Sequence, residues 1–91
     1  MNIAKIYPNK SLHTASRIID RQAVVIIPQK GQVNLLNPVG SRIWELADGK
    51  KSLNEIAMLI ANEFEVAPQV AYLDTEEFVR GLWEKGMLVL Q

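Results

Sequence analysis

The spacing of apolar residues changes once along this chain, at Asn37-Pro38. Before that point, apolar residues form short runs or alternate with polar ones, which is typical of β-strands. After it they recur every three or four residues, which is typical of amphipathic helices. Strands that come first and helices that follow, without alternation, predict an α+β domain.

Three segments before the change are predicted to be strands: Thr14 to Asp20, Ala23 to Pro28 and Gln32 to Leu36. The turn Gln29-Lys30-Gly31 joins the last two, and its glycine can supply a positive φ. The second segment is apolar on both faces, which favours the central position of an antiparallel sheet. Sequential strand order then leaves Gln32 to Leu36 at an edge, where one row of backbone groups has no partner.

Three helices are predicted after the change. Asn37 caps the first, and Pro38 occupies its first position, where a missing N–H costs nothing. A capping box formed by Ser52 and Glu55 starts the second. Beyond the last helix, Met87 to Leu90 either adds a short strand or packs against the rest of the fold.

The third predicted helix, from about Pro68 to Lys85, carries two apolar stripes about 100° apart around its axis. The first stripe holds Ala71, Phe78 and Leu82, and the second holds Tyr72, Val79 and Trp83. One stripe is enough to cover a small sheet or a helix pair. The second needs another surface, so either the first helix covers it or it lines a groove against the edge strand.

Composition and charge exclude several classes of protein. The chain has no cysteine, which excludes disulfides and cysteine-based metal sites. Its longest apolar run, Ala23 to Ile27, is too short to span a bilayer, and the N-terminus lacks the pattern of a signal peptide, so a cytoplasmic protein is expected. Residues 1–51 carry a net charge of +5 and residues 52–91 a net charge of −5, which indicates attraction between two halves of one domain.

Catalytic chemistry has little support in the sequence. The only histidine, His13, has no acidic residue or cysteine close by, and the residues around Ser41 do not form the G-x-S-x-G pattern of a nucleophile elbow. The adjacent carboxylates Glu76 and Glu77 are typical of a solvated helix surface. We therefore do not expect an enzyme.

DNA binding is an alternative, because three helices with a small sheet are typical of winged-helix transcriptional regulators. Contacts with phosphates require Lys and Arg on the element that enters the groove. The helix that begins at Ser52 carries Glu55 and Glu63 and no basic residue, and the third helix is also acidic on balance. These charges disfavour nucleic acid as a partner.

Peptide binding by strand addition fits the pattern better. An edge strand offers backbone hydrogen bonds, and a neighbouring apolar groove can accept alternate side chains of an added strand. The predicted peptide-binding residues are Val33, Asn34, Leu35, Leu36, Tyr72, Glu76, Val79 and Trp83. Self-pairing of the same edge, which would give a homodimer, is a further alternative.

Two runs, LNPVGSRIWELADGKKSLNEIAMLIANEF and DTEEFVRGLWEKGML, resemble the PqqD family. These are small proteins of pyrroloquinoline quinone biosynthesis and their relatives in other peptide-modification pathways. The matching features are Leu36-Asn37, Gly40, Ile43-Trp44, Leu46, Asp48-Gly49, Ile56, Asp74, Phe78, Leu82 and Gly86-Met87-Leu88. The match covers about residues 14–90, the predicted core of a single domain 1–91, and departs mildly at Met87, where the family often has leucine.

The resemblance implies a winged-helix-like fold, a three-stranded antiparallel sheet followed by three helices. It implies that the leader of a ribosomally made precursor peptide binds as a strand added to Val33 to Leu36, in the cleft against the third helix. It also implies a second partner, a modifying enzyme that is often a radical S-adenosylmethionine (SAM) enzyme. In that role the chain is a peptide chaperone that carries no cofactor itself. Because Trp44 lies on a capped helix, we expect it to support the core rather than touch the ligand.

Overall fold

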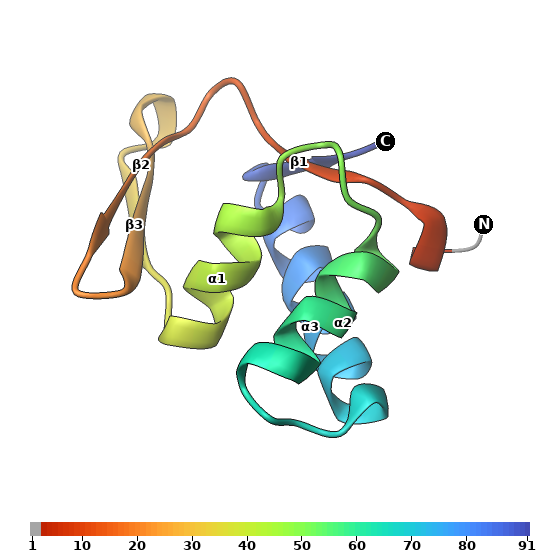
Figure 1. The fold of residues 1–91 in the computed structure, drawn as a ribbon. Helices are drawn as coiled ribbons and strands as arrows, with labels where there is room; N and C mark the ends of the chain where they lie inside the picture. The colour runs from red at the N-terminus through yellow and green to blue at the C-terminus, as the bar shows by residue number, and fades with distance from the viewer. Residues whose placement is uncertain (1–2) are drawn as a thin grey trace.

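The computed structural model describes residues 3–91. In chain order these residues form the 3₁₀ turn η1 (Ile3–Lys5), β1 (Pro8–Lys10), β2 (Ala15–Ile19), β3 (Gln22–Ile27), the 3₁₀ turn η2 (Pro28–Lys30), β4 (Gln32–Leu35), α1 (Pro38–Leu46), α2 (Leu53–Glu63), α3 (Pro68–Glu84) and β5 (Leu88–Leu90). The predicted α+β order, an antiparallel sheet followed by three helices, is confirmed (Figure 1). Along residues 3–91, no helix combines the length and the hydropathy needed to span a membrane.

The main sheet is the antiparallel meander β2-β3-β4, with β3 in the centre as its doubly apolar sequence predicts. The turn into β4 uses η2 followed by Gly31, whose φ of 62° lies in the left-handed region that glycine adopts without strain. One face of β3 is fully buried through Ala23, Val25 and Ile27. The edge position of β4 is therefore confirmed within the described sheet.

The helices begin where the sequence predicts. The Asn37 side chain accepts a hydrogen bond from the Gly40 N–H at 2.7 Å, with Pro38 at the first position of α1. The capping box of α2 is complete, since Ser52 and Glu55 each accept a hydrogen bond from the backbone N–H of the other. These local bonds satisfy N–H groups that a helix start leaves without intrahelical partners.

The core lies between the sheet and the helices. In Figure 1, α1 stands between the sheet and α2, and α3 packs chiefly against α2. Trp44 of α1 is 1% exposed, and its indole N–H donates to the Ser16 hydroxyl at 3.1 Å. Trp44 is thus a core residue, as expected.

A second, two-stranded sheet was not predicted. β1 pairs antiparallel with β5, with Pro8 opposite Leu90 and Lys10 opposite Leu88. This pairing resolves the alternative left open for the C-terminal segment, which forms a strand. It also joins the N-terminal part of the described chain to the end of α3.

The outer face of the main sheet carries apolar side chains with little cover. Val24 pairs with Leu35, and Ile26 pairs with Val33. Leu35 and Val33 are 65% and 67% exposed. The buried face of the sheet is the opposite one, towards the helices.

Candidate functional site

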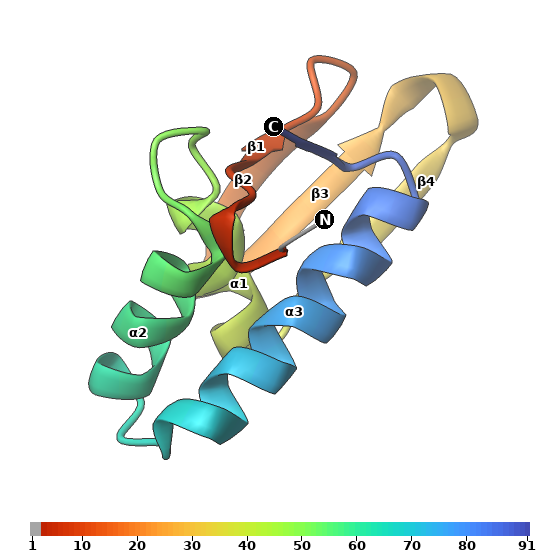
Figure 2. The ribbon, with the colours of Figure 1, turned by 90° about the vertical axis from the view of Figure 1, so that its right-hand side faces the viewer.

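The open edge of β4 lies beside α3 (Figure 2). β4 pairs with β3 on one side, and its other side borders a groove of about 530 Å³. The groove is lined by Asn34, Leu35, Leu36, Asn37, Asp74, Glu77, Phe78, Gly81, Leu82 and Lys85. One wall is therefore strand and the start of α1, and the other wall is one side of α3.

The floor of the groove is apolar. Leu36 and Leu82 belong to the buried core, and Phe78 is partly buried against it. Phe78 lies so close to α1 that a Cβ added at Gly40 would stand 2.5 Å from two atoms of its ring. Glycine at that position lets the ring pack against the start of α1, which keeps Phe78 in the groove wall.

The chain between β4 and α1 is held by a buried hydroxyl group. Ser41 accepts a hydrogen bond from the Ala23 N–H at 2.6 Å and donates one to the Leu36 carbonyl at 3.1 Å. The Leu36 N–H in turn donates to the Ala23 carbonyl at 2.9 Å. Ser41 thus closes the last rung of the β3–β4 ladder where the strand gives way to the helix, and its role is structural.

The alternation of the antiparallel ladder shows which backbone groups of β4 are free. Leu36 bonds to Ala23, so Asn34 and Gln32 occupy the other hydrogen-bonded positions facing β3. The N–H and C=O groups of Val33 and Leu35 then point towards the open edge. These are the groups that an added strand would pair with.

The predicted peptide-binding residues fall into two groups. Asn34, Leu35 and Leu36 line the groove, and Val33 offers its backbone at the same edge. The four predicted on α3, Tyr72, Glu76, Val79 and Trp83, are absent from the groove lining.

Each of those four α3 residues has other surroundings. Val79 is 0% exposed and belongs to the core, so the expectation that it lines a groove is wrong. Tyr72 borders a separate hollow with Asn54 of α2, and Glu76 accepts a hydrogen bond from Arg80 at 3.1 Å. Trp83 is 49% exposed outside the groove.

The physical reason lies in the position of the buried line on α3. Ala71, Thr75, Val79 and Leu82 are its buried residues, and this line runs between the two stripes recognised in the sequence. At about 100° per residue, Tyr72 and Trp83 share one flank, where Tyr72 borders α2 at Asn54. Phe78 and Gly81 lie on the other flank, towards β4. Helical periodicity gave both stripes but could not show which flank would face the edge strand.

The groove residues that the prediction missed are Asn37, Asp74, Glu77, Phe78, Gly81, Leu82 and Lys85. Phe78 and Leu82 were assigned to the core stripe. A glycine well inside a helix, Gly81, was the available signal, because it weakens a helix unless the space beside it is used.

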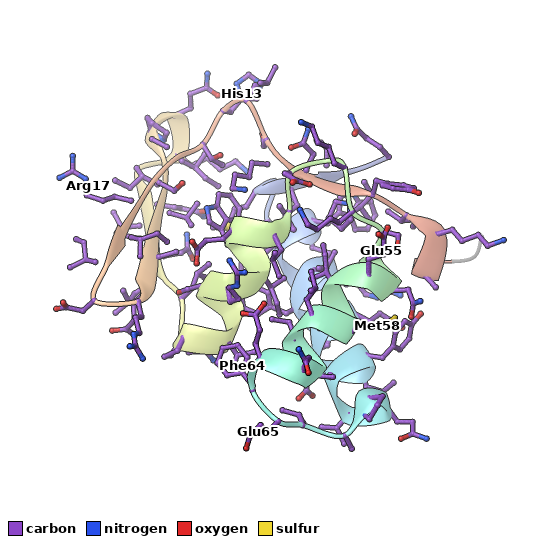
Figure 3. The ribbon with its side chains drawn as sticks, in the orientation of Figure 1. His13, Arg17, Glu55, Met58, Phe64 and Glu65 are labelled. Atoms are coloured by element: carbon purple, nitrogen blue, oxygen red, sulfur yellow. The ribbon has the colours of Figure 1, made fainter. Side chains whose placement is uncertain are left out.

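Among the described residues, those that line the groove include no histidine and no cysteine. Within residues 3–91, no three His, Cys, Asp or Glu side chains are placed to hold a metal ion. His13 lies on the connection between β1 and β2, far from the α2–α3 connection that holds Glu65 (Figure 3). Burial lowers the pKa of Lys10, whose ammonium lies over the Trp44 ring at 5.4 Å and donates to the Ala47 carbonyl.

Comparison with known proteins identifies relatives of this fold. Among solved structures, TbiB1 in complex with the TbiA(beta) leader peptide is 34% identical, with a TM-score of 0.81 over 88% of this chain and 93% of that one. Lasso peptide synthetase B1 complexed with the leader peptide is 22% identical, with a TM-score of 0.81 over 91% of this chain and 98% of that one. The PqqD part of Methylobacterium extorquens PqqCD, a stand-alone recognition element for ribosomally synthesised and post-translationally modified peptides, is 19% identical, with a TM-score of 0.73 over 90% and 87%.

The last two structures support the fold alone. None of the curated proteins compared with the sequence matches it. The family model described as coenzyme PQQ synthesis protein D (PqqD) matches residues 22–88, from the start of β3 to the start of β5. This match spans more than half of the sequence, and the chain belongs to the PqqD family.

Proposed function

We propose that this protein is a peptide chaperone that binds the leader of a ribosomally made precursor peptide and presents it to a modifying enzyme. The leader adds a strand to the open edge of β4, and alternate side chains enter the groove against α3. The observation that carries this proposal is the free backbone of Val33 and Leu35 beside that groove. The 34% identical TbiB1, solved with a leader peptide, supports the same ligand class.

The geometry suits an extended peptide. An added strand gains backbone hydrogen bonds without requiring a particular sequence, and the groove supplies the apolar contacts that select side chains. Ordering a flexible peptide offsets part of that gain. We therefore expect a Kd of roughly micromolar, which corresponds to about −8 kcal/mol.

The second partner in this proposal is the modifying enzyme, of the radical SAM class in pyrroloquinoline quinone biosynthesis or a related pathway. The chaperone contributes binding and presentation, and the enzyme contributes the chemistry. A purified mixture of chaperone, leader and candidate enzyme tests this step by size-exclusion chromatography. A ternary complex that requires the leader supports it, and an enzyme that never co-elutes contradicts it.

Strand addition is tested by changing one backbone group. Val33→Pro removes an N–H that faces the open edge and leaves the bonds to β3 intact, which edge strands tolerate. Val33→Ala is the matched control, because it shortens the same side chain and keeps the N–H. In amide NMR titrations with a precursor leader peptide, the TbiA(beta) leader being the first probe, we expect wild type and Val33→Ala to bind and Val33→Pro to bind at least tenfold more weakly.

Two results would contradict the proposal. A folded Val33→Pro variant with wild-type affinity would show that the leader does not pair with β4. Binding of duplex DNA, with no response to the leader, would favour the winged-helix regulator instead. Sedimentation of the free protein adds a third check, because a homodimer formed through β4 would have to dissociate before the leader binds.

A further inference from the structure

We propose that the groove selects a leader segment with a basic, an apolar and an acidic side chain at alternate positions i, i+2 and i+4, in that order from the N-terminus. This inference rests on the proposed function and specifies its ligand. It follows from the direction of α3 along β4, from unpaired charges at opposite ends of the groove, and from the space at its centre.

α3 and β4 run in opposite directions along the groove. The Phe78 ring lies against Gly40, just beyond the C-terminal end of β4. At the other end, a Cβ added at Gly86 would stand 3.7 Å from the Nζ of Lys30, which lies two residues before the start of β4. The middle of α3, around Phe78, therefore lies beside the chain that follows β4, and its last turn lies beside the start of β4.

The charges of the groove are separated along this axis. Asp74 and Glu77 line the end beside Leu36 and Asn37. Lys85 lines the opposite end, where Lys30 also lies. The groove is thus acidic at one end and basic at the other.

The charged side chains at the two ends of the groove have no ion-pair partner in residues 3–91; they are Asp74, Glu77, Lys85 and Lys30. The ion pairs of the described chain are Arg42–Glu63, Lys51–Asp48 and Arg80–Glu76. On α3 itself, Arg80 therefore pairs on the flank away from the groove and leaves Glu77 unpaired. Unpaired charges at the ends of a groove give specificity for a ligand of complementary charge.

The centre of the groove is apolar and open. Gly81 presents no side chain, and a Cβ added there would meet no atom within 4 Å. Phe78 and Leu82 flank this opening along the helix. A single apolar side chain of the ligand fits between the two charged ends.

The spacing follows from helix and strand geometry. Glu77 and Lys85 are eight residues apart on α3, or about 12 Å at 1.5 Å per residue. Four residues of an extended strand cover about 14 Å, and residues i, i+2 and i+4 share one face. The three groove-facing ligand residues then lie opposite Leu36, Asn34 and Gln32.

The order of charges depends on strand direction. The described pairs of this sheet are antiparallel, and antiparallel pairing is slightly the more stable kind. An antiparallel ligand places its N-terminal end beside Asp74 and Glu77 and its C-terminal end beside Lys85. The basic residue therefore precedes the acidic one.

The test uses two synthetic peptides with blocked ends, Thr-Lys-Thr-Phe-Thr-Glu-Thr and Thr-Glu-Thr-Phe-Thr-Lys-Thr. Amide NMR titrations give the Kd of each and report whether β4 responds. The reversed-charge variant combines Glu77→Lys with Lys85→Glu. Its matched control combines Glu65→Lys with Lys50→Glu, which makes the same charge changes outside the groove lining (Glu65 is labelled in Figure 3).

We expect wild type and the control to bind the first peptide about tenfold more tightly than the second, a difference of about 1.4 kcal/mol. The preference should largely disappear in the reversed-charge variant, because the retained Asp74 and Lys30 leave each end of the groove with one charge of each sign. It should also shrink at high salt, because exposed pairs are screened. Equal binding of both peptides at β4 by wild type would overturn the charge order and leave strand addition intact. If neither peptide perturbs β4, strand addition and the charge order are both overturned.

Discussion

Gly81 provides a sharp test of the groove, because the same position affects stability and binding in opposite directions. It lies inside α3, where glycine is about 0.8–1.0 kcal/mol less favourable than alanine. A Cβ at this position meets no atom within 4 Å, so alanine brings no clash. We expect Gly81→Ala to stabilise the protein by about 0.5–1 kcal/mol and to raise its Tm by roughly 2–8 °C.

Leucine has nearly the same helix propensity as alanine, but in Gly81→Leu the longer side chain reaches into the groove. This variant should remain at least as stable as wild type, since its position is open to solvent. Filling the opening would deprive the leader of the burial of one apolar side chain, which is worth about 1.5–3 kcal/mol. The Kd for the leader should therefore rise roughly tenfold to a hundredfold, whereas Gly81→Ala keeps most of the affinity.

Urea unfolding monitored by circular dichroism measures the stability of the three proteins, and calorimetric or NMR titration with the leader measures affinity. Gly81→Ala is the matched control, because it makes the same backbone change without filling the groove. A Gly81→Leu protein that is stable and binds the leader with wild-type affinity would refute the assignment of the groove. A destabilised Gly81→Ala would refute the argument that this position is open.

Three further predictions concern parts of the fold that surround the site. Ser41→Ala should destabilise the protein by about 1–3 kcal/mol in urea unfolding, because it leaves the Ala23 N–H buried without its acceptor. Thr75→Val should stabilise it by about 1 kcal/mol in the same assay, because the Thr75 hydroxyl is fully buried without a hydrogen-bond partner. The Lys51 ammonium, with the Lys50 N–H, lowers the pKa of Asp48 from 3.8 to about 2. The stabilising contribution of the ionised Asp48 carboxylate is therefore complete above about pH 4 and lost as the pH falls through 2. Carboxyl NMR shifts measured against pH should show this pKa, and Lys51→Met should raise it towards 3.8.

The strands and helices of this fold were predictable because their signals are local. The cap at Asn37, the capping box at Ser52 and the apolar run of β3 each lie within a few residues of the structure they specify. The two caps accept hydrogen bonds from backbone N–H groups within three residues, and the apolar run identifies a buried strand by its own composition. None of these signals depends on distant packing. The edge position of β4 followed from sequential strand order alone.

β1 was missed because its partner lies at the other end of the sequence. It contains three residues, begins with Pro8 and pairs with β5. Such a short segment has no periodicity of its own, and proline is a poor indicator of a strand except at an edge or a first position. The pairing exists because the tertiary fold brings the two segments together.

The groove side of α3 was missed for a related reason. Phe78 and Val79 are neighbours in sequence, and periodicity places them about 100° apart without specifying which one is inside. Packing against α2 and α1 buries Val79 and leaves Phe78 beside β4. The glycine at position 40 completes this choice, because the Phe78 ring occupies the space that a Cβ would take.

Gly40 and Ser41 shape the site although neither lines the groove. The Ser41 hydroxyl bridges the Ala23 N–H and the Leu36 carbonyl at the end of the β3–β4 ladder, which fixes the position of the strand edge that the leader would meet. Gly40 admits Phe78, which fixes the opposite wall. Because Asn37 and Pro38 turn the chain into α1 at once, the protein's own backbone does not continue along the open edge. The groove therefore depends on two residues outside its lining, so substitutions of Gly40 or Ser41 should change affinity for the leader through the shape of the groove.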